Sequence, residues 1–169
     1  YTQSGAELSR KDHYFSGIVS YSLKSWPAAI ESFSHVLSQD DELGQNAWYY
    51  TANSYLQTRN KIAALEAFKA ASDCDYDKVI QEDAFFNYAK LSFDVNADIT
   101  PFRTYMERWS ASGKDDIINS YVATSSISDK DYVGAIDALH RIGNPSEGDL
   151  SNLQKALLLR AVELINNIS

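Results

Sequence analysis

The segment Asn46–Ala71, NAWYYTANSYLQTRNKIAALEAFKAA, decides the fold of this chain. Two sets of small and aromatic residues follow each other in it at spacings of three and four residues: Trp48, Ala52 and Tyr55, and then Ala64, Phe68 and Ala71. Such spacing places the members of each set on one face of an α-helix. The segment therefore predicts two helices packed back to back, with small residues at the contact and aromatic rings filling the space around it.

The same arrangement recurs along the chain at intervals near 35 residues. The position of Ala64 is repeated as Ala29, Pro101 and Ala135, at intervals of 35, 37 and 34 residues, and the position of Ala52 as Gly17, Ala89 and Ala123. Side chains able to cap the second helix of each pair stand just before it: Ser25, Asn60, Thr100 and Asp131. We expect pairs at about residues 10–42, 45–74, 79–111 and 115–143, and one more helix at 149–168.

This pattern resembles the tetratricopeptide repeat (TPR), a helix pair with a period of about 34 residues. The resemblance covers nearly all of the chain beyond residue 10 and is strongest in residues 45–74. It is weakest in residues 79–111, where Pro101 and Tyr105 replace the Ala and Phe of the pattern. The resemblance implies an all-α fold of about nine helices, a right-handed α-solenoid of stacked antiparallel helix pairs (a TPR superhelix).

A second resemblance concerns origin and location. The phrase AWYYTANSYL followed by AFFNYAKLSF is similar to large multi-repeat TPR proteins of Gram-negative, Bacteroides-like cell envelopes, which implies a bacterial protein of the periplasm or envelope. The chain opens at Tyr1 without a signal-peptide pattern, and no second helix follows the apolar run ALLLRAVELI near its end. We therefore expect residues 1–169 to be one solenoid segment cut from a longer chain, ending in a cap or in the first helix of a fifth repeat.

Composition narrows the classes of partner. A formal charge of −8 argues against nucleic acid, because binding to phosphate backbones depends on clusters of Lys and Arg. No apolar run approaches the ~20 residues of a membrane span, so we expect no direct membrane insertion. Cys74 is the only cysteine, which excludes an internal disulfide. These features favour a protein or peptide partner.

The TPR resemblance also implies where such a partner binds, because the first helices of TPR pairs line a concave groove. It assigns nine residues to the groove: Tyr14, Ile18 and Tyr21, then Tyr49, Asn53 and Leu56, then Phe86, Lys90 and Phe93. Tyr and Phe offer a large contact area, Asn53 carries both a donor and an acceptor for a peptide backbone, and Lys90 suits a carboxylate. The alternative is that these aromatic rings pack against neighbouring helices and leave no pocket.

The sequence does not favour a metal-binding, catalytic or phosphate-binding site. Asp73–Asp77, DCDYD, resembles the opening of a calcium loop, but Lys78 stands in place of the turn glycine and Ala84 in place of the bidentate Glu. His13, His35 and His140 lie in different parts of the chain, without a second His or Cys at ligand spacing. Neither a G-x-S-x-G element nor a phosphate-binding glycine loop is present.

We therefore expect no enzyme, no cofactor and no metal. The predicted function is a protein–protein interaction scaffold that binds a peptide or protein segment in an aromatic groove. The alternative is a structural spacer or a self-association module within a larger envelope protein, with contacts through the C-terminal helix at residues 150–168.

Overall fold

The structure is a computed structural model that describes residues 7–110 and 113–168. Its described residues form nine helices and no strand, which confirms the all-α prediction. In chain order the helices are α1 (Arg10–Ser22), α2 (Trp26–Ser34), α3 (Glu42–Gln57), α4 (Lys61–Asp73), α5 (Lys78–Asn96), α6 (Thr100–Arg108), α7 (Asp115–Ser128), α8 (Tyr132–His140) and α9 (Glu147–Asn166). None of these described helices combines the length and apolar character needed to cross a membrane.

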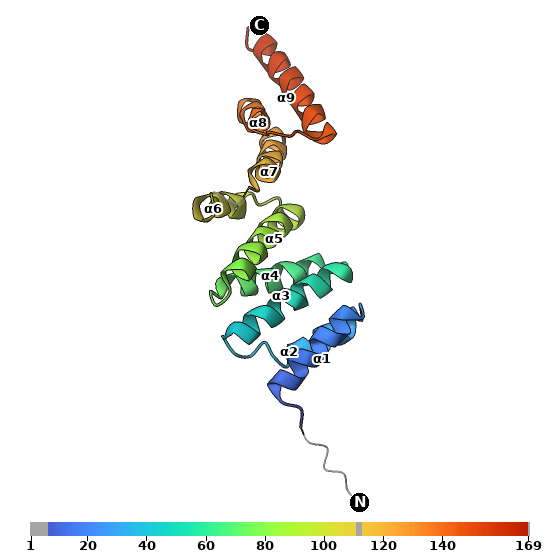
Figure 1. The fold of residues 1–169 in the computed structure, drawn as a ribbon. Helices are drawn as coiled ribbons and strands as arrows, with labels where there is room; N and C mark the ends of the chain where they lie inside the picture. Colours follow the sequence, from blue (N-terminus) through green and yellow to red (C-terminus); the bar gives the residue numbers. More distant parts are fainter. Residues whose placement is uncertain (1–6, 111–112, 169) are drawn as a thin grey trace, which may run out of the picture. The chain divides into compact units, whose positions relative to one another are not determined.

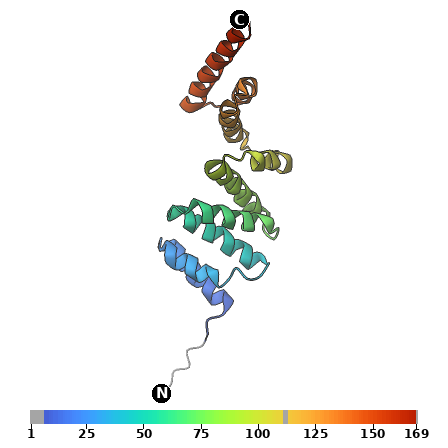
Figure 2. The same cartoon turned by 180° about the vertical axis from the view of Figure 1, so that it is seen from behind.

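The helices fall into two compact units, one ending at Asn96 and the other starting at Ala97. In the first unit, α1 to α4 each pack against the next helix in the chain, and α3 also contacts α1 and α5 (Figure 1). In the second unit, α8 packs against both α7 and α9, and α7 also contacts α9 (Figure 2). Tyr121 of α7 stacks on Phe102 of α6 with ring centroids 4.7 Å apart. Within each unit, helices that follow each other in the chain therefore pack together.

The turns inside three of the pairs have the same backbone structure. Lys24, Arg59 and Lys130 each have a positive φ of about 60° (58°, 61° and 62°) just after the first helix of their pair. The N–H groups of Arg59 and Asn60 close the end of α3 on the carbonyls of Leu56 and Tyr55, and the turns at Lys24 and Lys130 repeat these bonds. This is a Schellman ending, whose last residue also serves as the N-cap of the next helix. Three successive residues thus connect the helices of a pair.

The core consists of the seams that the sequence pattern predicts. The second-helix stripes are buried throughout: Ala29, Phe33 and Val36; Ala64, Phe68 and Ala71; Pro101 and Tyr105; Ala135, Leu139 and Ile142. The four small residues of the first helices, Gly17, Ala52, Ala89 and Ala123, are buried as well. A Cβ added at Gly17 would lie only 2.5 Å from the Phe33 ring, so the glycine is required by the close approach of α1 and α2. Small residues therefore face large ones, as expected.

The observed N-caps of the second helices agree with the predicted capping residues only in part. Asn60 and Asp131 cap α4 and α8 through hydrogen bonds from Ala63 N (3.1 Å) and Gly134 N (2.9 Å). Ser25 occupies the N-cap position of α2 but its side chain makes no capping hydrogen bond. The predicted cap at Thr100 is wrong, because Thr100 is the first residue of α6 and its N–H donates to Asp98 Oδ1 at 2.9 Å. An Asp two residues earlier reaches the same backbone donor.

A buried side chain that the sequence did not single out holds the connection between α4 and α5. Gln45 of α3 is 0% exposed. Its Nε2 lies 3.2, 3.0 and 3.2 Å from the carbonyl oxygens of Ala71, Cys74 and Asp77, and its Oε1 accepts the N–H of Asp77 at 2.7 Å. The amide therefore satisfies backbone groups that would otherwise be buried without partners.

Candidate functional site

The nine residues predicted to line the groove all lie in the first unit. They are carried in threes by α1, α3 and α5, the helices that the sequence predicts to begin the first three pairs. Because α3 contacts both α1 and α5, the structure brings these three helices together. Whether they form a peptide-binding groove depends on what each side chain still offers to a partner.

The three residues of α1 are largely used in packing. Tyr14, Ile18 and Tyr21 are half-buried and pack on the cluster around Phe33. The Tyr21 ring lies 5.2 Å from that of Trp26 and 5.0 Å from that of Tyr50, in edge-on contacts. Burial raises the pKa of both Tyr14 and Tyr21 above the usual value. These side chains therefore stiffen the first pair and expose only part of their rings.

A hydrogen-bonded group connects α3 with α5. The Tyr49 hydroxyl donates to Asp83 Oδ2 at 2.5 Å, and Asn87 Nδ2 donates to the same oxygen at 3.0 Å. Burial, reinforced by the bond to Asp83, raises the pKa of Tyr49 well above its usual value, so the phenol keeps its proton. Asn53, one turn beyond Tyr49, donates its amide to the Tyr49 carbonyl at 3.0 Å. The polar side chains at this point are held in fixed positions.

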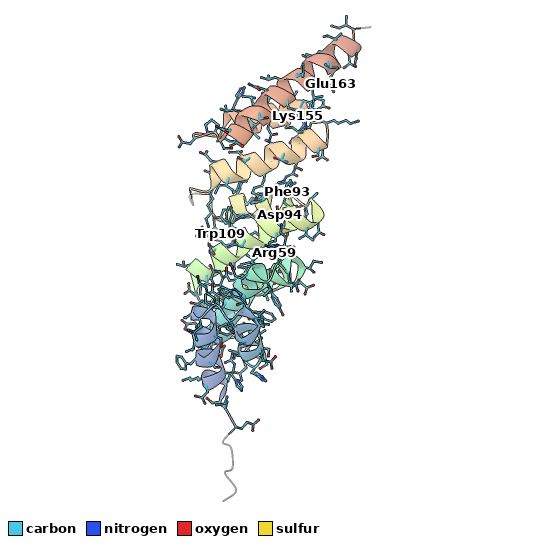
Figure 3. The ribbon with its side chains drawn as sticks, turned by 90° about the vertical axis from the view of Figure 1, so that its right-hand side faces the viewer. Arg59, Phe93, Asp94, Trp109, Lys155 and Glu163 are labelled. Atoms are coloured by element: carbon cyan, nitrogen blue, oxygen red, sulfur yellow. The ribbon has the colours of Figure 1, made fainter. Side chains whose placement is uncertain are left out.

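The residues of α5 differ from one another in exposure. Phe86 is only 6% exposed, so it contributes packing rather than a contact surface. Lys90 is half-buried and its Nζ lies 5.8 Å from the Phe86 ring centroid, in a cation–π contact. Phe93, labelled in Figure 3, is half-buried, and so is Leu56, which packs on the cluster around Phe68. The surface on α5 is thus more polar than the sequence suggested, with Asp83, Asn87 and Lys90 on one helix.

Sequence reasoning missed Asp83 and Asn87. A signal for Asp83 was available, because it lies 34 residues after Tyr49, one repeat period, and so occupies the equivalent place on the next first helix. Residues in equivalent places of adjacent repeats are neighbours in a stack, and these two are hydrogen-bonded. We call Tyr49, Asn53, Asp83, Asn87 and Lys90 the polar face.

The acidic connection between α4 and α5 contains Cys74, the one cysteine of the sequence. A hollow of about 330 Å³ in the first unit is lined by Leu37, Ser38, Gln39, Asp40, Trp48, Asp73 and Cys74. Burial and the nearby Asp40 raise the pKa of the Cys74 thiol to about 11, so the thiolate needed for nucleophilic chemistry is scarce at neutral pH. Among the described residues no three His, Cys, Asp or Glu side chains gather in a way that could hold a metal ion.

Two histidines that are far apart in sequence meet in the structure. His13 of α1 and His35, just after α2, stack with ring centroids 4.2 Å apart, and His35 Nε2 lies 3.6 Å from Glu31. The sequence shows no ligand spacing between them, because 22 residues separate them. Their rings are stacked face to face, an arrangement that packs the pair rather than directing two nitrogens at one ligand.

The chain matches no protein-family model and no curated protein. Its membership of the TPR family therefore stays a prediction from the repeated residues. A proposal for the function therefore rests on the geometry of the helix pairs and of the polar face.

Proposed function

We propose that this chain is a TPR-like α-solenoid that binds a polypeptide segment across the adjoining first helices α1, α3 and α5. The repeated three-residue turns support a repeat protein, because three pairs share one connection, one capping position and one small-against-large seam. Repeat proteins of this kind use their extended surfaces for binding.

The observation that carries the proposal is the polar face. Tyr49, Asp83 and Asn87 are bonded to one another between two adjacent helices, and Asn53 is bonded within its own helix. Side chains held in this way lose little further conformational entropy when they bind a ligand. Asp83 and Lys90 place opposite charges seven residues apart, two helical turns, along α5. Such a face suits an extended peptide that offers backbone hydrogen bonds and a charged side chain.

A displayed peptide library tests the proposal. We expect the chain to select peptides with an acidic residue near one end, because Lys90 is the basic group of the polar face. A Lys90→Glu variant should then select basic residues at that place. The matched control is Lys24→Glu, an exposed position in the turn between α1 and α2 that carries the same charge change outside the face.

The outcome has two clear forms. Peptides that depend on Lys90 and not on Lys24 support the groove. Failure to enrich any peptide, or enrichment unaffected by Lys90→Glu, refutes the proposal and leaves the spacer or self-association module as the better account.

A further inference from the structure

The repeated pattern changes at one position of α7. Four residues before the buried small residue, the helices α1, α3 and α5 carry a ring: His13, Trp48 and Phe85. Helix α7 carries Asn119 at this position, four residues before Ala123. The Trp48 ring packs on the cluster around Phe68, and Phe85 is 7% exposed. In α7, a smaller and polar side chain therefore stands where the other helices place a ring.

A hollow of about 320 Å³ lies beside Asn119, between helices that are labelled in Figure 1. Met106 of α6 and Ser110 line it on one side, Asp115 and Asn119 of α7 on another, and Arg141, just after α8, completes the lining. All five residues belong to the second unit. The volume is near the lower end of the about 300–1,000 Å³ that is typical of small-molecule sites. The hollow therefore suits a ligand of few atoms.

The amide of Asn119 is buried but makes no hydrogen bond within the described part of the chain, although the residue is only 6% exposed. Asn46, Asn53 and Asn87 instead donate to the carbonyl four residues earlier in their helices, at 2.9, 3.0 and 2.9 Å. Among the described residues, Thr51 Oγ1 is the side-chain polar atom that has neither a partner nor contact with solvent. The Asn119 amide therefore reaches solvent, and it does so in the hollow that it lines.

Two opposite charges border the same hollow without meeting. Asp115 and Arg141 are both exposed, and neither forms an ion pair with a residue that the structure describes. Asp115 precedes Asn119 by one helical turn, so the carboxylate and the amide stand on one side of α7. A simple anion would be repelled by Asp115 and a simple cation by Arg141. This combination therefore favours a ligand that carries both charges.

We propose that the hollow binds a free α-amino acid with an apolar side chain. Arg141 pairs with the carboxylate of the ligand, and Asp115 pairs with its ammonium group. The Asn119 amide has both a donor and an acceptor, so it bonds to either group and gains the hydrogen bond that it lacks in the free chain. The thioether of Met106 adapts to apolar side chains of different shape and packs against this part of the ligand.

A free amino acid fits the lining better than the end of a polypeptide does. The first residue of a peptide has an ammonium group but no carboxylate beside it, and the last residue has the reverse. Either end would therefore leave one of Asp115 and Arg141 without its partner. In a free amino acid, both groups are attached to one carbon atom and reach both side chains of the hollow.

Titration of the whole chain with L-leucine, followed by NMR at the side-chain NH₂ of Asn119, tests the proposal. We expect saturable binding with a Kd of about 1 mM or lower. L-Leucinamide lacks the carboxylate and N-acetyl-L-leucine lacks the ammonium group, so each should bind at least about tenfold more weakly than L-leucine. These two compounds also imitate the two ends of a peptide.

Variants of the chain locate the binding. Arg141→Gln should weaken the binding of L-leucine, measured by calorimetry, at least about tenfold. The matched control is Arg103→Gln, an exposed residue of α6 outside the hollow, which should change the affinity less than about twofold. Asn119→Leu should also weaken binding at least about tenfold. This variant should not lower the melting temperature, because leucine is similar in size and removes an amide that has no partner.

Other results overturn the proposal. The absence of saturable binding at about 20 mM L-leucine would show that the hollow takes no amino acid. Equal binding by the Arg141→Gln or Asn119→Leu chain would place the ligand elsewhere. Equal affinity for L-leucinamide or N-acetyl-L-leucine would assign the hollow to a peptide end or to a singly charged ligand. A lower melting temperature of Asn119→Leu would give the amide a structural role instead of a binding role.

Discussion

The tightest contact between two helices of a pair is at Gly17, and Gly17→Ala tests how the seams are built. An added Cβ would lie 2.5, 2.7 and 2.8 Å from Cε1, Cδ1 and Cζ of Phe33. The Phe33 ring is 0% exposed and cannot move away freely, because the Tyr50 ring stacks on it at 5.8 Å and the Tyr14 ring lies 5.9 Å away. The methyl group must therefore push α1 away from α2 or displace several rings.

The expected magnitude is the difference of two opposing effects. Overpacking a filled core costs about 1–3 kcal/mol, and three contacts below 3.0 Å place this site near the upper end. Replacing glycine by alanine inside a helix stabilises it by about 1 kcal/mol. The packing cost wins, and we expect a net loss of about 2 kcal/mol. A Phe33→Leu change in the same chain should recover part of that loss, as coupled neighbours do.

Hydrogen exchange is the suitable assay, because two compact units need not unfold in a single transition. Amides of α1 and α2 that exchange through opening of the first pair should exchange about thirtyfold faster in Gly17→Ala. The control is Gly148→Ala in α9, where the nearest heavy atom to the new Cβ is Ser146 Oγ at 3.6 Å and no loss is expected. Unchanged or slower exchange in Gly17→Ala would refute the reasoning that the seam is tight.

Three further predictions concern the connections. Gln45→Glu should destabilise the first unit by at least about 3 kcal/mol in urea denaturation, because the carboxylate oxygen that replaces Nε2 would face three carbonyl oxygens. The bond from the Asp77 N–H to the other oxygen would remain. A loss below about 1 kcal/mol would contradict this prediction. Arg59→Gly should stabilise the chain by up to about 1 kcal/mol, because Arg59 has a φ of 61°, which only glycine adopts without strain. A lower melting temperature of this variant would contradict the prediction. Asp41 bonds to Arg10 through both oxygens (2.6 and 2.7 Å), which lowers its pKa to about 2 from 3.8. The stability due to this pair is therefore complete above about pH 4 and is lost as pH falls towards 2, and an acid titration of Arg10→Gln should lack this component.

Local spacing made the core predictable. Ala64, Phe68 and Ala71 had to share one helical face, and all are fully buried. Where a prediction depended on a second helix, the sequence was not sufficient. Leu157, Ala161 and Leu164 have the same spacing as Trp48, Ala52 and Tyr55, yet they are exposed, because burial requires a partner helix that the described chain does not place there.

At the candidate site, too, the sequence did not predict features that depend on the packing of one helix on another. The sequence placed Phe86 on the binding surface, but α5 turns that ring into the core, where 6% of it remains exposed. The bond between Tyr49 and Asp83 joins residues 34 positions apart and depends on how α3 and α5 align. Neither result follows from helical periodicity within one helix. The repeat period could have paired Tyr49 with Asp83, but the place of Asn87 beside them became visible only with α3 and α5 together.

The environment of Cys74 has a practical consequence for spectroscopy. Burial and the nearby Asp40 raise the pKa of the Cys74 thiol to about 11, and the sulfur also donates to the Ala70 carbonyl at 3.4 Å, so the reactive thiolate is scarce at neutral pH. Maleimide dyes should therefore react slowly with the parent chain. A cysteine introduced at an exposed site could be labelled selectively without first removing the native one, which makes single-dye experiments on either unit direct.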